Sequence, residues 1–228
     1  MQLQAAPDLV VAPYLIPFTR EPSTMQIDPE NSKVPDLYRL MIGMVVPRPI
    51  AWISSAYADD RHNLAPFSFF NAFSVSPPIL GVGIGARRGP DGTIIKKDTL
   101  NNIEARGEFV VNIVSLPLAE KMNHSAGEFA PETSEFEAAG LTAIAGTKVA
   151  VPRVEEAPVS MECVLHQTVP LGNSNLVLGK VVFMHIKDEI LENGQIAIDK
   201  LKPVGRLSGN AYCKVEAGSI FELLRPEI

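Results

Sequence analysis

The sequence has only two cysteines in 228 residues, Cys163 and Cys213, and they form no C-x-x-C pair. Such sparse cysteine excludes a disulfide-rich scaffold and favours two buried free thiols over a disulfide. No apolar run is long enough to span a bilayer, because Arg48 interrupts the best candidate at residues 40–58. The N-terminal stretch lacks a positively charged region, so we expect no signal peptide and a cytoplasmic protein.

The chain also lacks a basic patch. Its formal net charge is −6, which argues against a nucleic-acid-binding protein and leaves room only for a local basic pocket. With 46% hydrophobic and 20% charged residues, the composition suits one fair-sized globular domain with its own core.

Three common catalytic signatures are missing as well. No G-x-S-x-G sequence marks a hydrolase nucleophile. The four histidines have no metal-ligand spacing, so we predict no metal site; they are His62, His124, His166 and His185. "GVGIGA" at 81–86 matches G-x-G-x-x-A, but the turn sequence "RRGPDG" follows it where a dinucleotide fold needs a helix. We therefore interpret 81–86 as a strand thinned by glycine, whose backbone approaches a neighbour closely.

The pattern along the chain indicates mostly strands. Residues 1–34 are proline-rich and read as an arm that packs over a domain or a neighbouring subunit, and 35–228 read as the domain. The turn "ADDRHN" predicts a hairpin of residues 50–57 and 64–75. Further strands are expected at 77–86, 109–114, 158–169 and 176–191. The last has no polar face around Val181 to Ile186, which predicts burial on both sides.

Helix signals are fewer. In "KKDTLNNIEARGEF", Asp98 is a candidate N-cap and Gly107 a candidate C-cap. A second helix is expected to start at Pro117, and a third, "SEFEAAG", to end at Gly140. Many strands with a few short helices predict an α+β domain, mainly β, built on an antiparallel barrel.

Three segments combine aromatic, hydroxyl and cationic side chains: "RPIAWISS" (48–55), "NLAPFSFFN" (63–71) and "KKDT" (96–99). A helix N-terminus favours a phosphate, and Lys96, Lys97, Arg87 and Arg88 add positive charge there. The carboxylate of Asp98 would repel a phosphate. The two fit together if Asp98 turns inward as the N-cap and Lys97 and Thr99 face the anion. An ordinary capped helix with a solvated run of charges explains the same residues, so both interpretations stay open.

At these residues the sequence resembles the flavin reductase-like family of FMN-binding split barrels. The matching motifs are "RPIAWISS", "NLAPFSFFN", "SPP", "PDGTIIKKDTLNNI", "GEFVVNIV" and "KPVGRLSGNAY", in order over residues 38–215. Two departures stand out. Ser208 replaces a common second glycine, and "TII" before "KKDT" is bulkier than the usual polar link.

The resemblance implies an antiparallel six-stranded Greek-key split barrel with a few flanking helices, forming a homodimer with FMN near the subunit interface. Arg48, Ser54 and Ser55 are implied to follow the ribityl and phosphate side, Lys97 and Thr99 to hold phosphate, and Arg206 and Tyr212 to close over the site. The full set of implied cofactor-binding residues is Arg48, Trp52, Ser54, Ser55, Ala65, Pro66, Phe67, Ser68, Asn71, Lys97, Asp98, Thr99, Arg206 and Tyr212.

The family's activity is NAD(P)H-dependent flavin reduction, often supplying reduced flavin to a separate monooxygenase. The resemblance thus implies FMN, rather than FAD, as cofactor and NAD(P)H as co-substrate. No side chain is expected to act as a proton-transfer catalyst, since the flavin carries the hydride chemistry. Two alternatives stay open: a flavin-binding electron carrier that ignores nicotinamide, and a split barrel recruited for ester hydrolysis by a serine and a histidine.

Overall fold

The computed structural model describes residues 20–21, 24–89, 91–129 and 133–226. The chain divides into two compact units, residues 1–41 and 42–228, whereas the sequence suggests a boundary after residue 34. Before the second unit come strands β1 (Arg20–Glu21) and β2 (Thr24–Met25), the 3-10 helix η1 (Pro29–Asn31) and helix α1 (Val34–Met44), which runs across the division. The role of residues 1–34 as a packing arm stays a prediction, and residues 1–19 and 22–23 lie outside the described part.

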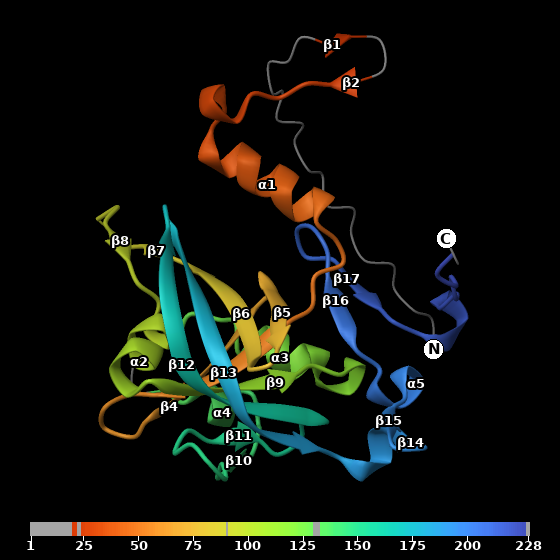
Figure 1. The fold of residues 1–228 in the computed structure, drawn as a ribbon. Helices are drawn as coiled ribbons and strands as arrows, with labels where there is room; N and C mark the ends of the chain where they lie inside the picture. The colour runs from red at the N-terminus through yellow and green to blue at the C-terminus, as the bar shows by residue number, and fades with distance from the viewer. Residues whose placement is uncertain (1–19, 22–23, 90, 130–132, 227–228) are drawn as a thin grey trace, which may run out of the picture. The chain divides into compact units, whose positions relative to one another are not determined.

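The second unit is built on one antiparallel sheet of seven strands in the order β4-β3-β9-β12-β13-β6-β5. Figure 1 shows its two longest strands, β12 and β13, side by side. The strands are β3 (Ala51–Ala56), β4 (His62–Phe67), β5 (Phe70–Val75), β6 (Pro78–Gly85), β9 (Glu108–Ile113), β12 (Val159–Leu171) and β13 (Ser174–Ile186).

The two ends of this sheet are joined by only two residues. β4 pairs with β3 at one end and β5 pairs with β6 at the other, yet only Ser68 and Phe69 separate them. The sheet must therefore curl until its end strands meet, which makes a barrel that is split between β4 and β5. The predicted hairpin of β3 and β4 is confirmed. The predicted six strands are wrong, because residues 64–75 break into two strands instead of running as one.

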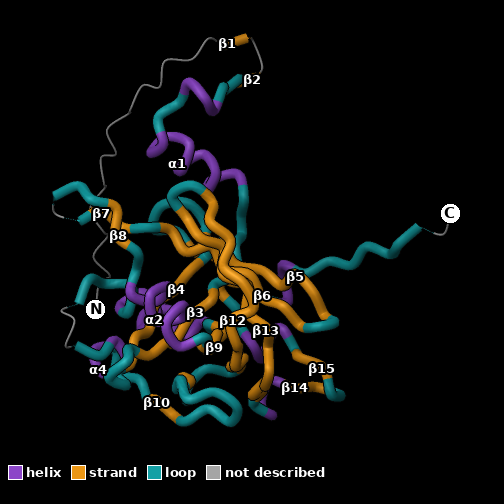
Figure 2. Tube along the Cα trace, turned by 60° about the vertical axis from the view of Figure 1, so that its left-hand side comes forward, coloured by secondary structure: helices purple, strands orange, loops and turns teal. Residues whose placement is uncertain are grey.

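Shorter elements surround the sheet. Paired two- or three-residue strands are β7 (Arg87–Arg88) with β8 (Ile94–Ile95), β10 (Ala143–Ile144) with β11 (Arg153–Val154), β14 (Leu191–Glu192) with β15 (Gln195–Ile196), and β16 (Val204–Arg206) with β17 (Tyr212–Lys214). The helices are α2 (Asp98–Arg106), α3 (Ala119–His124), α4 (Glu135–Ala138) and α5 (Ile198–Leu201), and the 3-10 helices η2 (Leu116–Leu118), η3 (Asp188–Ile190) and η4 (Ala217–Ser219). Helices α2, α3 and α4 all contact β4, and Figure 2 shows α2 beside β3 and β4.

The helix ends agree with the sequence more closely than the helix starts. Gly107 and Gly140 follow their helices with positive φ angles of 72° and 62°, as predicted. Asp98 is not the N-cap, because the first helical bonds go to the carbonyl of Lys97, which has extended backbone. Pro117 lies inside η2, and the α-helical turn begins only at Ala119.

The interior of the barrel is apolar, and β3 is buried on both faces. Ala51 and Ile53 point into the main core, while Trp52 points into a second cluster that contains Leu64 of β4 and Phe136 of α4. Because α3 and α4 cover the outer side of β3, no residue of this strand reaches solvent. A strand buried on both faces leaves its serines in the interior as well.

The glycines of β6 make room for aromatic rings of the β5 side, as the predicted close approach requires. A Cβ atom on Gly81 would lie 2.4 Å from Cε2 of Phe73, and one on Gly83 would lie 3.0 Å from Cβ of Phe69. Residues with side chains would collide with these rings at both positions.

The prediction that β13 is buried on both sides is wrong for its last part. Phe183 is 37% exposed, Met184 49% and Ile186 39%. The apolar run 181–186 therefore reflects an uncovered outer surface of the unit rather than an interior strand.

Both cysteines are free thiols, as the sequence predicted, but only Cys163 is buried, and Cys213 is partly exposed. Burial, and then the charge of Glu162, raise the pKa of the Cys163 thiol to about 12, so it stays protonated and unreactive at neutral pH. No described helix combines the length and the apolar composition that crossing a lipid bilayer requires.

Candidate functional site

A cleft of about 390 Å³ lies where the second half of β4 meets the start of α2. Its walls come from four further places in the chain: the residues after β6, the start of β7, the loop after α3 and the start of α4. The lining residues are Asn63, Ala65, Pro66, Phe67, Ala86, Arg87, Lys97, Asp98, Thr99, Ser125, Ala126, Gly127, Glu128, Phe129 and Glu135. A volume of this size suits a small organic ligand.

Six of the residues predicted from the sequence lie together on this cleft. They are Ala65, Pro66, Phe67, Lys97, Asp98 and Thr99. The apolar members come from the strand, and the polar members come from the first turn of the helix. One wall can thus contact a flat apolar group while the other meets an anion.

Lys97 is the central cation of the cleft. Its ammonium lies 5.3 Å from the ring centre of Phe67 and, among the described residues, makes no hydrogen bond or ion pair. Burial of the ammonium group, and then the charge of Arg87, lower its pKa although water still reaches the residue. Such a combination is expected of an exposed cation whose ammonium lines an open cleft, and it favours an anionic ligand.

Thr99 is held in place by a chain of hydrogen bonds from the interior. The amide of Asn63 donates to the Thr99 hydroxyl at 3.0 Å and to the Ser55 hydroxyl at 3.2 Å, and Asn102 donates to Ser55 at 3.1 Å. Because its oxygen accepts from Asn63, the Thr99 hydroxyl can turn its proton into the cleft. Ser55 thus supports the residues that line the cleft and does not line it itself, whereas the resemblance implies a direct contact with the cofactor.

Asp98 faces the cleft entrance rather than acting as a cap. Its carboxylate is 3.7 Å from Arg87, and the Asp98 side chain is 42% exposed. The sequence suggested an inward-turned cap, but the N-cap position falls on Lys97, and no hydrogen bond from a described backbone N–H reaches the Asp98 carboxylate. The ion pair with Arg87 neutralises this acid instead.

The sequence missed the parts of the cleft that come from α4 and from the loop after α3. Glu135 of α4 accepts a hydrogen bond from the backbone N–H of Leu64 at 3.2 Å. The loop of residues 125–129 supplies Glu128 and Phe129, and the ring of Phe129 lies 5.6 Å from that of His124. The only signals were "HSAGEF" and "SEFEAAG", which show small residues, acids and aromatics but no recognisable ligand pattern.

Trp52 and Ser54 lie inside the unit, and neither lines this cleft. The indole Nε1 of Trp52 donates to the hydroxyl of Ser125 at 2.9 Å. The Ser54 hydroxyl donates to the carbonyl of Pro152 at 2.6 Å and accepts from Asn112 at 3.2 Å. Trp52 therefore supports the cleft from behind, through its hydrogen bond to Ser125 and its strand pairing with Pro66, both of which line the cleft.

Arg48 is a buried arginine that ties chain segments together. Its guanidinium donates to the carbonyls of Ile42 at 2.7 Å, Val45 at 2.6 Å and Leu207 at 2.9 Å, and it also lies 3.4 Å from the hydroxyl of Ser68. Its backbone pairs with that of Arg206. Because its guanidinium is bonded to three backbone carbonyls, the Arg48 side chain stabilises the fold of the chain.

The remaining three predicted residues lie away from the cleft. Asn71 is exposed on β5. The guanidinium of Arg206 stacks on Tyr212 at 4.4 Å, and the Tyr212 hydroxyl donates to Asn123 at 3.3 Å. Tyr212 lines a separate pocket between α3 and β17. Their contact with a cofactor stays a prediction.

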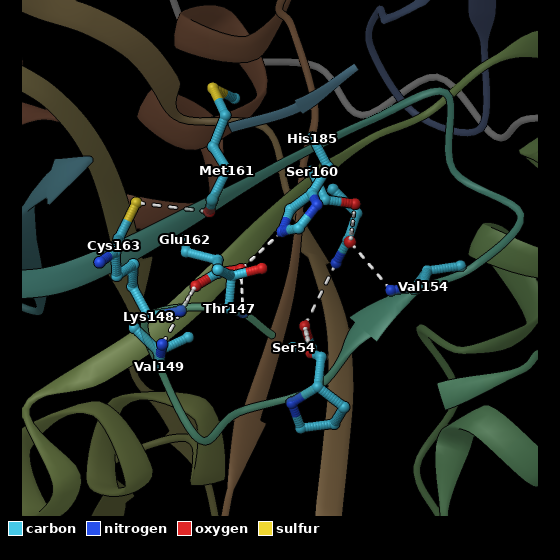
Figure 3. Close-up of polar contacts among 12 residues, drawn as sticks. Ser54, Thr147, Lys148, Val149, Val154, Ser160, Met161, Glu162, Cys163 and His185 are labelled. Carbon is cyan, nitrogen blue, oxygen red and sulfur yellow. Dashed lines mark hydrogen bonds and ion pairs between the residues drawn. The ribbon is translucent and has the colours of Figure 1, made fainter. Parts of the chain in front are cut away.

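Among the described residues, the carboxylate with the most hydrogen-bond donors belongs to Glu162 of β12, which lies outside the cleft. Figure 3 shows its fully buried side chain accepting hydrogen bonds from the backbone of Thr147, Lys148 and Val149 and from His185 at 2.6 Å. Burial opposes ionisation, but the bonds from His185 and the three N–H groups outweigh it and lower the pKa of Glu162. This contact fastens the 147–149 segment to the barrel.

No group of three or more histidine, cysteine, aspartate or glutamate side chains is arranged to hold a metal ion within the described ranges.

Comparison with known proteins decides the family. The model of the flavin reductase like domain matches residues 43–202, which is most of the second unit. The chain belongs to the flavin reductase like family. The family membership inferred from six ordered motifs is confirmed, and the cleft lies at two of those motifs, "NLAPFSFFN" and "KKDT".

Solved structures of this family superpose well on the chain. Component B of nitrilotriacetate monooxygenase from Bacillus cereus is 35% identical, covers 89% of this chain and 100% of its own, and gives a TM-score of 0.82. The 2-nitrobenzoate 2-nitroreductase of Pseudomonas fluorescens is 31% identical, with coverages of 88% and 96% and a TM-score of 0.77. A Shewanella frigidimarina protein with a split barrel domain is 20% identical over 90% of this chain and 100% of its own, with a TM-score of 0.72, which confirms the fold alone.

Proposed function

We propose that this protein is an FMN-binding NAD(P)H:flavin oxidoreductase that transfers a hydride from reduced nicotinamide to flavin. The observation that carries the proposal is the cleft itself. There the Lys97 ammonium, which has no ion pair among the described residues, lies at a helix N-terminus beside aromatic and apolar residues of β4. Membership of the flavin reductase like family supports the same reaction class.

The residues of the cleft suit FMN part by part. Lys97, the Thr99 hydroxyl and the first N–H groups of α2 form the end that would hold the phosphate. Ala65, Pro66 and Phe67 form the wall that would support the isoalloxazine. Arg48, Ser54, Ser55 and Trp52 would shape the site from behind, and a partner subunit would bring any contact from Arg206 and Tyr212.

When bound, FMN supplies the hydride chemistry, and the chain supplies position and charge. The cation of Lys97 neutralises phosphate and fixes one end of the ligand. The Ser55, Asn63 and Thr99 hydrogen bonds keep the first turn of α2 in register with β4. Holding the flavin in one pose leaves one face for the nicotinamide, and fixing two reactants in this way lowers the entropic part of the barrier.

We further propose a cytoplasmic homodimer that supplies reduced flavin to a separate monooxygenase. A similar chain is named as the B component of a monooxygenase, which supports this arrangement. Another similar chain is named a nitroreductase, so a nitroaromatic acid is the second acceptor to test.

The test is anaerobic mixing of the FMN-loaded protein with NADH and, separately, with NADPH. Loss of the yellow flavin absorbance with either one, faster than for free FMN at the same concentration, is the expected result. If FMN binds but keeps its absorbance with both nicotinamides, the chain is an electron carrier and the reductase proposal is wrong. Adding free FMN or 2-nitrobenzoate after reduction then identifies the acceptor.

Ester hydrolysis gains no support from the site. Among the hydrogen bonds of the described residues, none joins a serine hydroxyl to a histidine ring, and His185 is engaged by Glu162. Turnover of a chromogenic ester without flavin, abolished by a serine-directed reagent, would revive that alternative.

A further inference from the structure

The charges around the cleft pose a problem for a phosphate ligand. Its described lining carries two cations and three carboxylates, namely Arg87, Lys97, Asp98, Glu128 and Glu135. A phosphate monoester brings a charge of about −2 at neutral pH. An uncompensated carboxylate beside it would repel it, and the repulsion grows as water is displaced.

Two of the three carboxylates can avoid the conflict. Asp98 is paired with Arg87 at 3.7 Å, and Glu128 is solvent-exposed on its loop and free to point outward. Water screens an exposed charge far better than one held against the protein. Glu135 is the remaining carboxylate.

Glu135 is held against the wall of the cleft. It is only partly exposed at the start of α4, whose next residue, Phe136, is fully packed in the second core cluster. Its Oε2 accepts from the Leu64 backbone N–H at 3.2 Å, and Leu64 directly follows Asn63, which binds Thr99. The carboxylate therefore lies close to the end of the cleft that would hold the phosphate and is held there by the Leu64 N–H.

Burial favours the neutral acid at this position. It raises the pKa of Glu135 more than the backbone hydrogen bonds lower it, and the Asp98 charge adds to the rise. The titratable and charged groups that face Glu135 from its own and the neighbouring elements are Tyr57, His62, Arg87, Lys97, Asp98, Glu128 and Glu137. None of them forms an ion pair with Glu135 among the described residues, so no neighbouring cation compensates its charge there.

We propose that Glu135 takes up a proton from solvent when a phosphate group enters the cleft and then donates a hydrogen bond to it. The Leu64 N–H keeps its acceptor, because a protonated carboxyl retains lone pairs beside its O–H. The inference rests on the proposed function only in naming FMN as the source of the phosphate. It makes Glu135 a binding residue that couples phosphate recognition to pH.

The experiment is calorimetric titration with FMN at about pH 8, where the phosphate is already a dianion because its second pKa is about 6. Running it in two buffers of different ionisation enthalpy counts the protons taken up. Riboflavin, which lacks the phosphate, is the matched ligand. Glu135→Gln is the test variant, and Glu137→Gln is the control, since it makes the same charge change at an exposed position of the same helix.

For the natural chain we expect an uptake of about one proton per FMN bound. The affinity for FMN, divided by the affinity for riboflavin, should fall by up to roughly tenfold for each pH unit above neutrality. Riboflavin should take up none. Glu135→Gln should abolish the uptake and flatten the ratio, whereas Glu137→Gln should preserve both. The measurement on the natural chain stands even if Glu135→Gln fails to fold.

Absence of proton uptake with FMN, or uptake that persists in Glu135→Gln, overturns the inference while leaving flavin reduction intact. If Glu128→Gln abolishes the uptake and Glu135→Gln does not, the proton is taken up by Glu128, and the inference is likewise overturned. If neither flavin binds, the proposed function fails, and inorganic phosphate becomes the probe. Phosphate binding with a Glu135-dependent proton then supports the inference, and binding without one overturns it.

Discussion

At the scale of single residues, the cleft and the barrel use charge in opposite ways. Lys97 is a cation without an anionic partner in the described chain, as a binding site requires. Glu162 is an anion whose oxygens are fully occupied by donors, as a structural contact requires. The two groups therefore differ in what their removal should do: one should affect ligand affinity and the other folding stability.

Lys97→Met should weaken FMN binding and leave folding unchanged. A hydrogen bond to a charged group contributes about 1.5–3 kcal/mol, and the loss should shrink at high salt because the site is open to screening. Flavin fluorescence titration at low and high salt measures it. Lys96→Met is the matched control, since that ammonium is already paired with Glu104 at 2.6 Å. Equal effects of the two variants would place the phosphate elsewhere.

Glu162→Gln should destabilise the fold and change its acid sensitivity. An amide presents an NH₂ to backbone N–H donors, and each buried donor left unpaired costs about 1–3 kcal/mol. Because the folded pKa lies below the ordinary value of 4.5, the carboxylate stabilises the fold above that pH, and the stability is lost as pH falls through the folded pKa. Urea unfolding from neutral pH down to about pH 3 should show a smaller acid loss in Glu162→Gln than in the natural chain.

The control for this variant is Glu108→Gln, whose carboxylate holds a single backbone N–H, that of Ala150 at 2.9 Å. Its effect should be smaller. Equal destabilisation by both substitutions would contradict the role given to the three donors and His185.

At the scale of elements, the break between β4 and β5 explains the composition of "NLAPFSFFNAFSVSPP". One predicted strand is really two, and their rings go to different places. Phe67 is buried in the barrel core and borders the cleft, Phe69 lies 5.9 Å from the Arg48 guanidinium, and Phe73 covers Gly81. The short polar side chains are divided as well: Asn63 supports Thr99 from the interior, Ser68 accepts from Arg48, and Asn71 and Ser74 are exposed on β5.

Glycine placement within the sheet leads to a paired prediction. A Cβ on Gly179 of β13 would lie 2.4 Å from Cζ of the fully buried Phe109, whereas a Cβ on Gly85 of β6 meets nothing within 4 Å. Gly179→Ala should lower the free energy of unfolding by about 1–3 kcal/mol through overpacking. Gly85→Ala should be neutral or stabilising by up to about 1 kcal/mol, since a strand glycine loses more entropy on folding.

Urea unfolding measures both substitutions, and Phe109→Leu in the Gly179→Ala background should restore part of the loss. If Gly179→Ala costs no more than Gly85→Ala, the ring of Phe109 does not restrict this position.

At the scale of the whole molecule, the exposed apolar side chains favour the proposed homodimer. Val75 at the end of β5 is 91% exposed, and Phe183 and Met184 at the end of β13 are exposed too. β6 lies between the two strands, with Pro78 paired to Val75 of β5 and the adjacent Ile79 paired to Lys180 of β13. Large apolar side chains left exposed on neighbouring strands are a feature of interaction surfaces.

Light scattering should therefore give twice the chain mass of 24.7 kDa. Val75→Glu combined with Met184→Glu should shift the protein toward the monomer, because charges buried in an interface without partners are costly. Leu171→Glu, at the far end of the β12–β13 hairpin and 53% exposed, should leave the dimer unchanged. A dimer that survives the double substitution would place its interface on another surface.

The sequence by itself determined the mainly-β class, the glycines that end two helices, the free thiols and the family, because these depend on local pattern and ordered motifs. It also brought six of the cleft residues together, since β4 and the start of α2 each carry them in short runs. Only the tertiary structure decided that Trp52, Ser54 and Ser55 lie in the interior, because one core cluster packs on each face of β3. It likewise decided that Arg48 is buried and bonded to backbone carbonyls. It alone added Glu135 and the 125–129 loop, which lie more than 25 residues from KKDT and meet it only when the barrel curls.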